Sequence, residues 1–485
     1  MYLVINLGLK SIRGIVYNSL GKKIDTKNFI IKTHINNNHV EQDTSEYILK
    51  LNKILIHLKK KKITSKIKYV SVTSSANCLL GLNKNYEPLT KVFTVLDFRA
   101  TEISTYNKFK SSKLLDPSHN LSKIIWQREN NIKIFNSCKY WVNNSDYICY
   151  YLTKQLVTDA LNYNKFLIKN TKVTKKIQSL FKIDKIYLPR KKEIGESLSL
   201  DNTVINKYDF NEKCKFIITT YDAICACLGS INTKNIYHNA SEVSGTVTSI
   251  RILTKTKPKN SGSVKISYIP LIDRYLIGLS NNLGGGIIEW YKNFFKKNNY
   301  YKNVKISYFK GMNYFYFFPF IFGDRGLGFS QASRGIFYGL GSNTNIDDLT
   351  KSVIDSAAFT SKYLFDEIKK NNSVGKIKSV TLSGGLARLK FLNKIKAKLF
   401  GVETLVAKDF ESTSLGCLIL MMASQSDKKF EKIINIIKLQ KIKETTDKTI
   451  ISKYQFFINF LKKNKKLFNI VHDSLIKKES HEKNL

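Results

Sequence analysis

Short apolar stretches separated by polar turns open the chain, and a longer periodic segment follows them. The stretches predict strands at residues 2–7, 12–17, 28–33 and 69–73. Between the last two, apolar side chains recur at helical spacing, which predicts a helix over residues 44–60. Three strands, a helix and a fourth strand in this order indicate an α/β domain with a mixed sheet.

A similar order returns in the second half. Residues 242–253 predict a strand, a Gly-Thr turn and a second strand. Further strands are expected at residues 265–269, 274–280 and 380–383, and helices at residues 347–370 and 412–424. Residues 428–485 combine many lysines with periodic apolar positions, which is typical of terminal amphipathic helices. We therefore expect domains over residues 1–240 and 241–440, and a lysine-rich helical extension over residues 441–485.

Length and composition fit this division. A chain of 485 residues with 43% hydrophobic side chains can form two large domains, each burying its own core. The chain starts without a basic leader ahead of an apolar stretch, and the most apolar run, residues 314–322, is too short to span a bilayer. We therefore expect a cytoplasmic protein without a membrane partner.

The formal charge of +43 allows two interpretations. A basic face could bind nucleic acid or a membrane surface. Alternatively, the charge reflects a general bias toward lysine, because the lysines are scattered over the whole length and no nucleic-acid-binding motif organises them. We favour the second interpretation and expect no specific nucleic-acid partner. The seven cysteines are odd in number and form no CxxC pair, which favours buried, reduced thiols over disulfides or a zinc site.

The turn between the first two predicted strands, residues 6–13 (NLGLKSIR), is a candidate phosphate site. Gly8 lets backbone N–H groups approach an anion closely, and Lys10, Ser11 and Arg13 add donors. Taken alone, the segment fits an ordinary β-hairpin equally well.

A second candidate phosphate turn, residues 244–248 (SGTVT), lies between the first two strands of the second half. Gly245 and Thr246 offer the same combination of a glycine with hydroxyl donors, although a plain turn explains them too. Two such hairpins, one opening each half, would together enclose one nucleotide between the domains.

Three further features are candidates for chemistry. Asp222 lies between a predicted strand and a helix of small residues, so it could cap that helix or act as a general base. Asp97 and Arg99 are an acid and a base one residue apart, which suits an ordinary surface pair or a substrate contact. Gly385 follows a strand within a Gly-Gly turn, where the backbone could approach an adenine or its ribose.

Together these residues resemble the FGGY carbohydrate kinases, which share the actin–hexokinase–Hsp70 superfold. The strongest match is residues 319–325 (PFIFGDR) with residues 334–340 (RGIFYGL), which resemble the family pattern P-Y-L-x-G-E-R…R-G-x-x-x-G-L. Other segments keep the family's order: residues 40–43, 96–99, 116–126, 285–290, 383–388 and 411–416. The resemblance implies an α/β fold of two actin-like (ribonuclease H-like) domains with an interdomain cleft.

The resemblance also implies roles and ligands. ATP with Mg²⁺ would be the cofactor, and a small sugar or polyol the substrate; many relatives form homodimers. Asp222 would be the catalytic base, and Asn6 with Asp222 would lie at the metal position. The implied cofactor-binding residues are Gly8, Lys10, Ser11, Arg13, Gly245, Thr246, Gly285 and Gly385. The implied substrate-binding residues are Ser75, Asn77, Asp97, Arg99 and Ala223.

Several positions depart from the family pattern. Asn6 stands where the family has an aspartate that organises Mg²⁺, and an amide lacks the charge this ion favours. Leu9 and Lys10 replace hydroxyl residues that touch phosphate, and Ala223 replaces an Asn or Gln that touches the sugar. Two hypotheses follow. The chain is an active sugar kinase, or it is a pseudokinase that binds nucleotide or sugar without efficient turnover.

Overall fold

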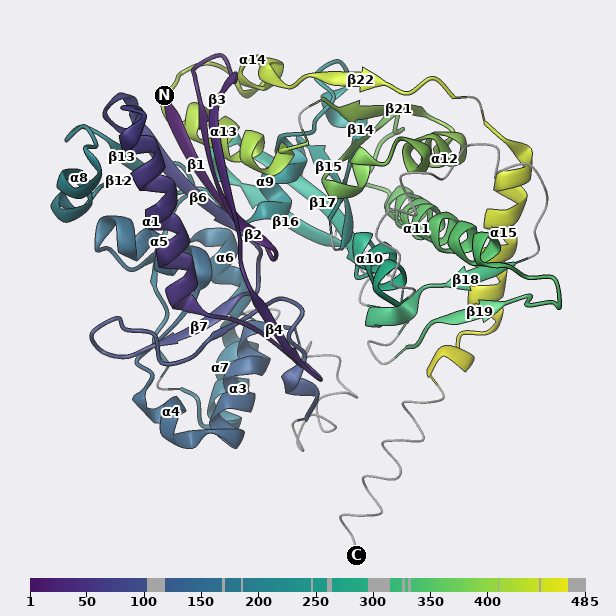
Figure 1. The fold of residues 1–485 in the computed structure, drawn as a ribbon, viewed down its shortest axis with the longest axis horizontal. Coiled ribbons are helices and arrows are strands. Elements are labelled where there is room, and N and C mark those ends of the chain that lie inside the picture. Colours follow the sequence, from purple (N-terminus) through teal and green to yellow (C-terminus); the bar gives the residue numbers. More distant parts are fainter. Residues whose placement is uncertain are drawn as a thin grey trace, which may run out of the picture. The chain divides into compact units, whose positions relative to one another are not determined.

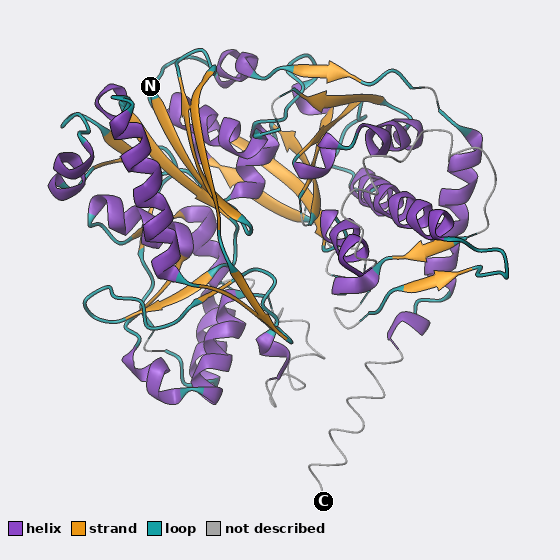
Figure 2. Cartoon of the chain, in the orientation of Figure 1, coloured by secondary structure: helices purple, strands orange, loops and turns teal. Residues whose placement is uncertain are grey.

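The computed structural model describes residues 1–102, 118–167, 171–184, 186–245, 247–259, 264–294, 315–324, 328–329, 333–408, 410–444 and 446–469. These residues form two compact units. The first unit comprises Met1–Gly229, Pro270–Ile272 and Thr413–Ile436, and the second comprises Ser230–Ile269, Asp273–Ser412 and Ile437–Leu485. Figure 2 shows strands at the centre of each unit with helices around them.

The first unit is built on a six-stranded sheet in the order β12-β13-β6-β1-β2-β3 (Figure 1). Its strands are β1 (Tyr2–Leu7), β2 (Ser11–Tyr17), β3 (Lys23–Ile30), β6 (Tyr69–Ser74), β12 (Ser197–Ser199) and β13 (Lys215–Ile217). β1 is antiparallel to β2 and parallel to β6, and β6 is parallel to β13. The carboxyl ends of β1, β6 and β13 therefore meet at one edge of the sheet.

Helices cover both faces of this sheet. The helix α1 (Thr44–Lys60) packs on β2 and β3 through a buried stripe at helical spacing. A Cβ at Gly14 of β2 would lie 2.3 Å from the Ile54 side chain, so glycine there allows the close approach of α1. The other helices of this unit are α3 (Asn120–Asn130), α4 (Ile132–Ser137), α5 (Asn144–Thr153), α6 (Ala160–Tyr163), α7 (Thr171–Leu180), α8 (Asn202–Tyr208), α9 (Asp222–Leu228), α13 (Ser412–Ser424, from Thr413 onward) and α14 (Phe430–Ile433).

A smaller sheet in the first unit carries the loops near the candidate substrate residues. Its order is β4-β5-β8-β7-β9, from β4 (Thr33–Asn36), β5 (His39–Gln42), β7 (Leu79–Leu82), β8 (Val92–Phe93) and β9 (Tyr140–Asn143). A separate parallel pair joins β10 (Val157–Asp159) to β11 (Arg190–Lys192).

The second unit repeats the strand framework of the first. Its sheet has the order β16-β17-β15-β14-β20-β21-β22. The strands are β14 (Asn239–Ser244), β15 (Thr248–Thr254), β16 (Lys265–Ile269), β17 (Arg274–Asn281), β20 (Ser379–Ser383), β21 (Glu403–Ala407) and β22 (Leu439–Lys441). As in the first unit, an antiparallel hairpin opens the sheet and its first strand, β14, is parallel to a later strand, β20.

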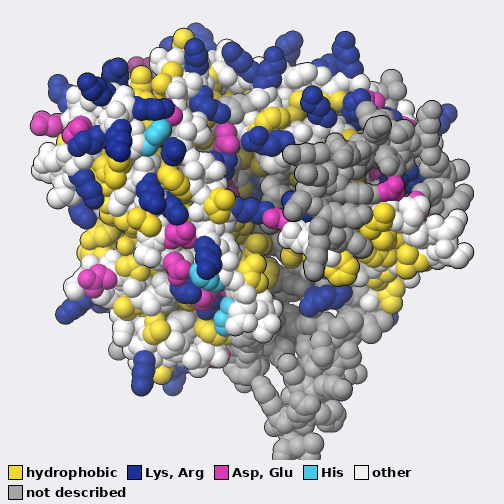
Figure 3. Space-filling view, viewed as in Figure 1, with side chains coloured by type: hydrophobic (Ala, Val, Ile, Leu, Met, Phe, Trp, Pro, Cys, Tyr) yellow, Lys and Arg dark blue, Asp and Glu magenta, His cyan; other side chains and the backbone are white. Residues whose placement is uncertain are grey.

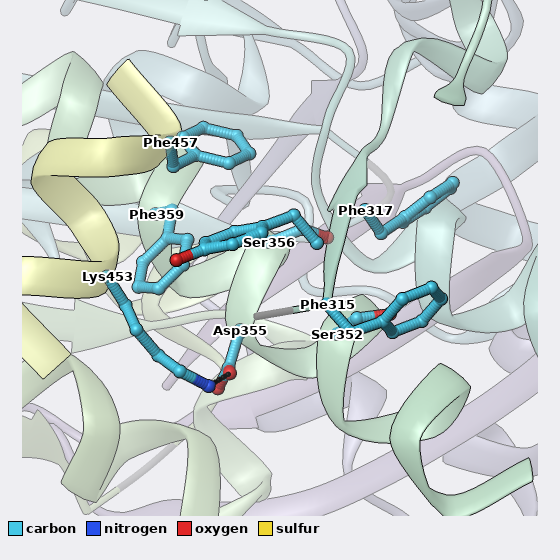
Figure 4. A pocket seen from close by; sticks show the side chains of 9 residues that line it. Phe315, Phe317, Ser352, Asp355, Ser356, Phe359, Lys453 and Phe457 are labelled. Atoms are coloured by element: carbon cyan, nitrogen blue, oxygen red, sulfur yellow. Dashed lines mark ion pairs between the residues drawn. The ribbon is translucent and has the colours of Figure 1, made fainter. Parts of the chain in front are cut away.

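Among the described residues, four α-helices and a hairpin complete the second unit. They are α10 (Gly285–Phe294), α11 (Ile346–Lys369), α12 (Lys390–Phe400), α15 (Lys448–Lys463), β18 (Tyr316–Phe318) and β19 (Ile336–Tyr338). The terminal helix α15 belongs to the core of this unit, since Phe457 is fully buried there. Its Lys453 Nζ lies 3.8 Å from Asp355 Oδ2 of α11, beneath a layer of aromatic rings (Figure 4).

Most of the elements expected from the sequence are confirmed, and one is wrong. The expected strand at residues 28–33 is instead β3, which begins at Lys23 and ends at Ile30. Because β3 is the edge strand of its sheet, its side chains alternate between exposed and half-buried, and this alternation lacks the apolar stretch used to place a strand. In the terminal segment, a strand, β22, precedes the expected amphipathic helix α15.

The cysteines and the lysines are distributed as their number and spacing in the sequence indicate. The seven cysteines all lie within the described ranges and none forms a disulfide; six are buried and Cys138 is half-buried. The lysines are dispersed: Figure 3 shows Lys and Arg side chains among acidic, apolar and neutral ones over the visible face. Among the described residues, no helix combines the length and apolar character needed to cross a membrane.

Candidate active site

The carboxyl edge of the first unit's sheet brings two predicted site residues, Asp222 and Ser75, into contact. Asp222 follows β13 and begins α9, while Ser75 follows β6. The Ser75 hydroxyl donates a hydrogen bond of 3.0 Å to Asp222 Oδ2. The Ser75 backbone N–H donates to the carbonyl oxygen of Leu7, at the end of β1, at 3.3 Å. Ser75 thus ties the candidate base to the start of the Gly8 turn.

Asp222 lies one residue inside α9, because Tyr221 occupies the N-cap position. The alternative interpretation of Asp222 as a capping residue is therefore not supported by its geometry. Its side chain is half-buried at the amino-terminal end of the helix, where the partial positive charge of the backbone favours a carboxylate. Ala223, the next residue, is also half-buried and adds no polar group.

The Gly8 turn is closed by hydrogen bonds to its backbone. Gly8 N–H donates to the carbonyl oxygen of Ser11 at 3.0 Å. The Leu9 carbonyl oxygen accepts a hydrogen bond from Gln42 Nε2 at 2.6 Å. Lys10 is exposed and Arg13 is half-buried, so both predicted cofactor-binding cations lie near the surface of the first unit.

Asn6 is 2% exposed, and its Nδ2 donates to the hydroxyl of Ser414 in α13 at 3.1 Å. The hydrogen bond explains how an amide is accommodated at a position where the family pattern has a carboxylate. The sequence placed Ser414 only within a family-like segment, because its closeness to Asn6 depends on a contact across 408 positions.

Asn77 has the properties of a polar ligand contact. Its backbone is left-handed (φ 59°), and its Oδ1 is buried without a hydrogen bond within the described part of the chain. A buried acceptor of this kind costs free energy unless a donor reaches it. The Asn77 carbonyl oxygen accepts from Lys123 Nζ at 2.8 Å, and Lys123 Nζ also donates to the Thr94 carbonyl oxygen at 2.6 Å.

Lys123 is a further residue whose role the sequence did not reveal. Its side chain is fully buried and joins the Asn77 loop to the segment that carries Asp97. A lysine so deeply buried is unusual, and the two carbonyl acceptors supply the polar partners it requires. In the sequence it appeared only as part of a family-like segment.

Asp97 and Arg99 form a buried pair, so the interpretation as an ordinary surface pair is wrong. They are 0% and 3% exposed, and Arg99 Nε and Nη2 each donate to one Asp97 carboxylate oxygen at 2.8 Å. Nη2 also donates to Glu41 at 2.5 Å. The guanidinium stacks on the rings of Phe93 and Trp126. The pair is rigid and planar, a geometry that lysine could not supply.

Three glycine turns converge in the second unit. The Gly285 N–H, at the start of α10, donates to the Gly245 carbonyl oxygen at 2.7 Å. A Cβ at Gly285 would lie 2.7 Å from that oxygen, so no other residue fits without movement. Gly384 has φ +83°, and a Cβ there would lie 2.7 Å from the Ser244 carbonyl oxygen. Gly385 has open space beside it, because a Cβ added there would meet no described atom within 4 Å.

This arrangement has the chemistry of an anion site. A glycine turn and the amino-terminal end of a helix present backbone N–H groups and partial positive charge. Thr246 lies outside the described residues. Among the described residues, no group of three or more His, Cys, Asp or Glu side chains could hold a metal ion.

Comparison with protein-family models identifies both halves of the chain. The model for the N-terminal domain of the FGGY family of carbohydrate kinases matches residues 1–229. The model for the C-terminal domain of the same family matches residues 241–424.

Individual relatives cover most of the chain. A xylulose kinase from Staphylococcus epidermidis is 24% identical over 437 residues, which is 86% of each chain. A gluconokinase from Bacillus subtilis is 20% identical over 82% of each chain. Among solved structures, gluconate kinase from Lactobacillus acidophilus superposes with a TM-score of 0.80 and 19% identity, covering 97% of this chain and 99% of its own. Plasmodium falciparum glycerol kinase with ADP gives a TM-score of 0.76 at 17% identity, with 96% and 98% coverage. The fold is therefore the actin-like two-domain α/β fold.

Proposed function

The chain belongs to the FGGY family of carbohydrate kinases, and from this we propose that it transfers a phosphoryl group from ATP to a hydroxyl of a small sugar or polyol, with Asp222 as general base. Its enzyme class is a phosphotransferase with an alcohol as acceptor. The observation that carries the proposal is the Ser75–Asp222 hydrogen bond at the carboxyl edge of the sheet. This bond orients a half-buried carboxylate on Ser75, two positions before Asn77, whose buried Oδ1 makes no hydrogen bond within the described part of the chain.

The proposed phosphoryl transfer forms one bond to phosphorus and breaks one. Asp222 takes the proton of the acceptor hydroxyl while the hydroxyl oxygen of the substrate bonds to the γ-phosphorus of ATP. The bond from that phosphorus to the bridging oxygen breaks, and ADP leaves. Ser75 holds the carboxylate in orientation. Asn77, Asp97 and Arg99 are the proposed sugar contacts, with Arg99 fixed by Asp97 so that it need not reorganise on binding.

The nucleotide is assigned to the glycine turns at Gly245, Gly285 and Gly385, whose backbone groups suit phosphate and adenosine. The Gly8 turn, with Lys10, is assigned to the transferred phosphate. Mg²⁺, when bound, would neutralise charge on the phosphates; Asn6 and Asp222 are the residues proposed near it. Asn6 offers an amide oxygen while its Nδ2 is held by Ser414, so its contribution would be a neutral ligand or a water contact.

The test is ADP release with ATP and Mg²⁺ against a panel of ketoses, heptoses, aldonates and polyols that includes xylulose, gluconate and glycerol, the compounds that the relatives' names indicate. Asp222→Asn serves as the blank. We expect sugar-dependent ADP release from one chemical group of the panel and its loss in the variant.

Two other results would change the proposal. Release that is unaffected by Asp222→Asn would remove Asp222 from the mechanism. Silence across the panel with ADP binding still measurable would favour the alternative of a kinase-like protein that binds ligands without turnover, and would direct attention to Asn6.

A further inference from the structure

A carboxylate and an ammonium group are buried together beneath the Gly245 turn. Glu242 of β14 forms an ion pair with Lys396 of α12, and the two residues are 1% and 2% exposed. The same carboxylate accepts a hydrogen bond of 2.6 Å from the Ser244 hydroxyl and another from the Ser361 hydroxyl of α11. Glu242 therefore connects two helices to Ser244, the residue that precedes Gly245.

Glu242 and Ser244 also contact the Gly384–Gly385 turn. The Ser383 hydroxyl donates to the Glu242 carbonyl oxygen at 3.1 Å. Gly384 is held so close to Ser244 that a Cβ would overlap the Ser244 carbonyl oxygen. A displacement of Ser244 would consequently move the backbone at both Gly245 and Gly384, because the packing between these two turns leaves no free space.

The first unit shows that this framework does not need a buried charge. Counting back from the turn glycine, Ile5 stands where Glu242 stands, and Leu7 stands where Ser244 stands. Both residues lie in a strand that pairs in parallel with a later strand, Ile5 with Val72 and Glu242 with Leu382, although the two hairpin loops differ by one residue in length. Ile5 and Leu7 are both fully buried. Replacing an apolar pair by a buried ion pair seldom increases stability, because desolvation offsets the attraction between the charges.

We propose that Glu242 and Lys396 are positioning residues for the nucleotide turn: the pair fixes Ser244, and through it the backbone N–H groups around Gly245 and Gly384. The ammonium group of Lys396 holds the Glu242 carboxylate in place, and the carboxylate holds the Ser244 hydroxyl. The inference rests on the proposed function, since the position of the turn matters only if it binds nucleotide.

The experiment measures the dissociation constant of ADP by isothermal titration calorimetry and the melting temperature of each variant. Lys396→Met leaves the Glu242 carboxylate without its cation, and we expect ADP to bind at least about fivefold more weakly. Lys453→Met is the matched control, because it breaks another buried ion pair of the same unit, with Asp355 at 3.8 Å. The control should lower the melting temperature without changing the affinity for ADP.

A second variant separates positioning from stability. Glu242→Leu with Lys396→Met copies the apolar support of the first unit, and it should recover most of the melting temperature while ADP binding stays weak. Ser244→Ala keeps the ion pair and removes only the hydroxyl that donates to Glu242. Ser244 is 1% exposed, so this hydroxyl is buried. It should weaken ADP binding with little change in melting temperature.

The outcomes are distinct. If affinity recovers together with stability in the double variant, or if Ser244→Ala binds ADP as the wild type does, the inference is overturned and the pair is structural. If the wild type binds no ADP at all, the proposed function fails instead. If Lys396→Met does not fold, Ser244→Ala and the double variant still decide the question.

Discussion

The two glycine turns that open the sheets stand on the same strand framework but rest on different side chains. Behind the Gly8 turn lie Ile5 and Leu7, which are fully buried and apolar. Behind the Gly245 turn lie Glu242 and Ser244, which are tied to each other and to Lys396. The two turns therefore share a strand order and differ in whether the side chains beneath the turn glycine are apolar or charged.

The edges of the two sheets also differ in the chemistry they present. The first unit offers a carboxylate, Asp222, oriented by Ser75. The second unit offers backbone groups, packed so closely at Gly285 and Gly384 that side chains are excluded. A carboxylate can exchange a proton, whereas a glycine turn at a helix end can only bind an anion. We therefore expect substitutions in the first unit to affect turnover and those in the second to affect nucleotide affinity.

The largest effect is expected from Asp222→Asn, which should lower turnover by roughly 100-fold or more, because a positioned base is lost while the shape is kept. Steady-state ADP release with the substrate found in the panel provides the measurement. Asp209→Asn is the matched control in the same unit, because Asp209 is exposed and its left-handed backbone (φ 57°) suits asparagine. Equal losses in both variants would refute the assignment.

Gly285→Ala should weaken ADP binding by about tenfold or more, since its Cβ would force the Gly245 carbonyl oxygen to move and misplace the turn. Gly385→Ala sharpens the comparison, because no described atom lies near the place its Cβ would take. That variant should keep the wild-type melting temperature and lose affinity only if adenosine packs against it. Calorimetric titration of ADP into both variants checks these expectations. An unchanged affinity in Gly285→Ala would contradict the assignment of this turn to the nucleotide.

Asn6→Asp should change the response to Mg²⁺ by a smaller, severalfold factor. The Ser414 hydroxyl, which now accepts from Asn6 Nδ2, can rotate and donate to a carboxylate, so the substitution is sterically mild. A carboxylate attracts Mg²⁺ more strongly than an amide does, so half-maximal activity should need less metal. Titration of activity with Mg²⁺ is the measurement, with Ser414→Ala as control. An identical Mg²⁺ profile would place Asn6 outside the metal's surroundings.

A separate prediction concerns stability and not activity, and it involves the buried acid Asp146 in the first unit. Burial raises the pKa of this carboxyl from 3.8 to about 7. The folded state therefore holds the proton more tightly than the unfolded chain, and stability falls as pH rises through this window by about 1.4 kcal/mol per pH unit. Asp146→Asn keeps an oxygen for the Asn143 N–H but cannot ionise. Urea unfolding at several pH values should show the wild type losing stability relative to the variant between about pH 5 and pH 7; a constant difference would contradict this.

Much of the framework was predictable because it depends on local pattern. The sequence shows the apolar stretches of β1 and β2, the periodic apolar face of α1 and the turn glycines. The strand β3 was misplaced because an edge strand buries too little to show an apolar pattern. The family resemblance, more than any single motif, directed attention to Asp222, since a helix cap explained that residue equally well.

The remainder of the site depends on contacts between distant segments. Asp97 and Arg99 looked like a surface pair because Phe93 and Trp126, which cover the guanidinium, cannot be placed from local sequence. Glu242 and Lys396 are separated by 154 positions, and each alone resembles an ordinary charged residue. The one available signal was a glutamate at the start of a predicted strand, which requires a partner once that strand is central in a sheet.

The most direct test of the proposed division between the two edges is the affinity of Asp222→Asn for ADP, titrated beside the wild type and Gly285→Ala. The account predicts that Asp222→Asn binds ADP as tightly as the wild type despite its loss of turnover, whereas Gly285→Ala binds it weakly. Weak binding by Asp222→Asn, or wild-type binding by Gly285→Ala, would contradict the separation of proton chemistry from nucleotide binding.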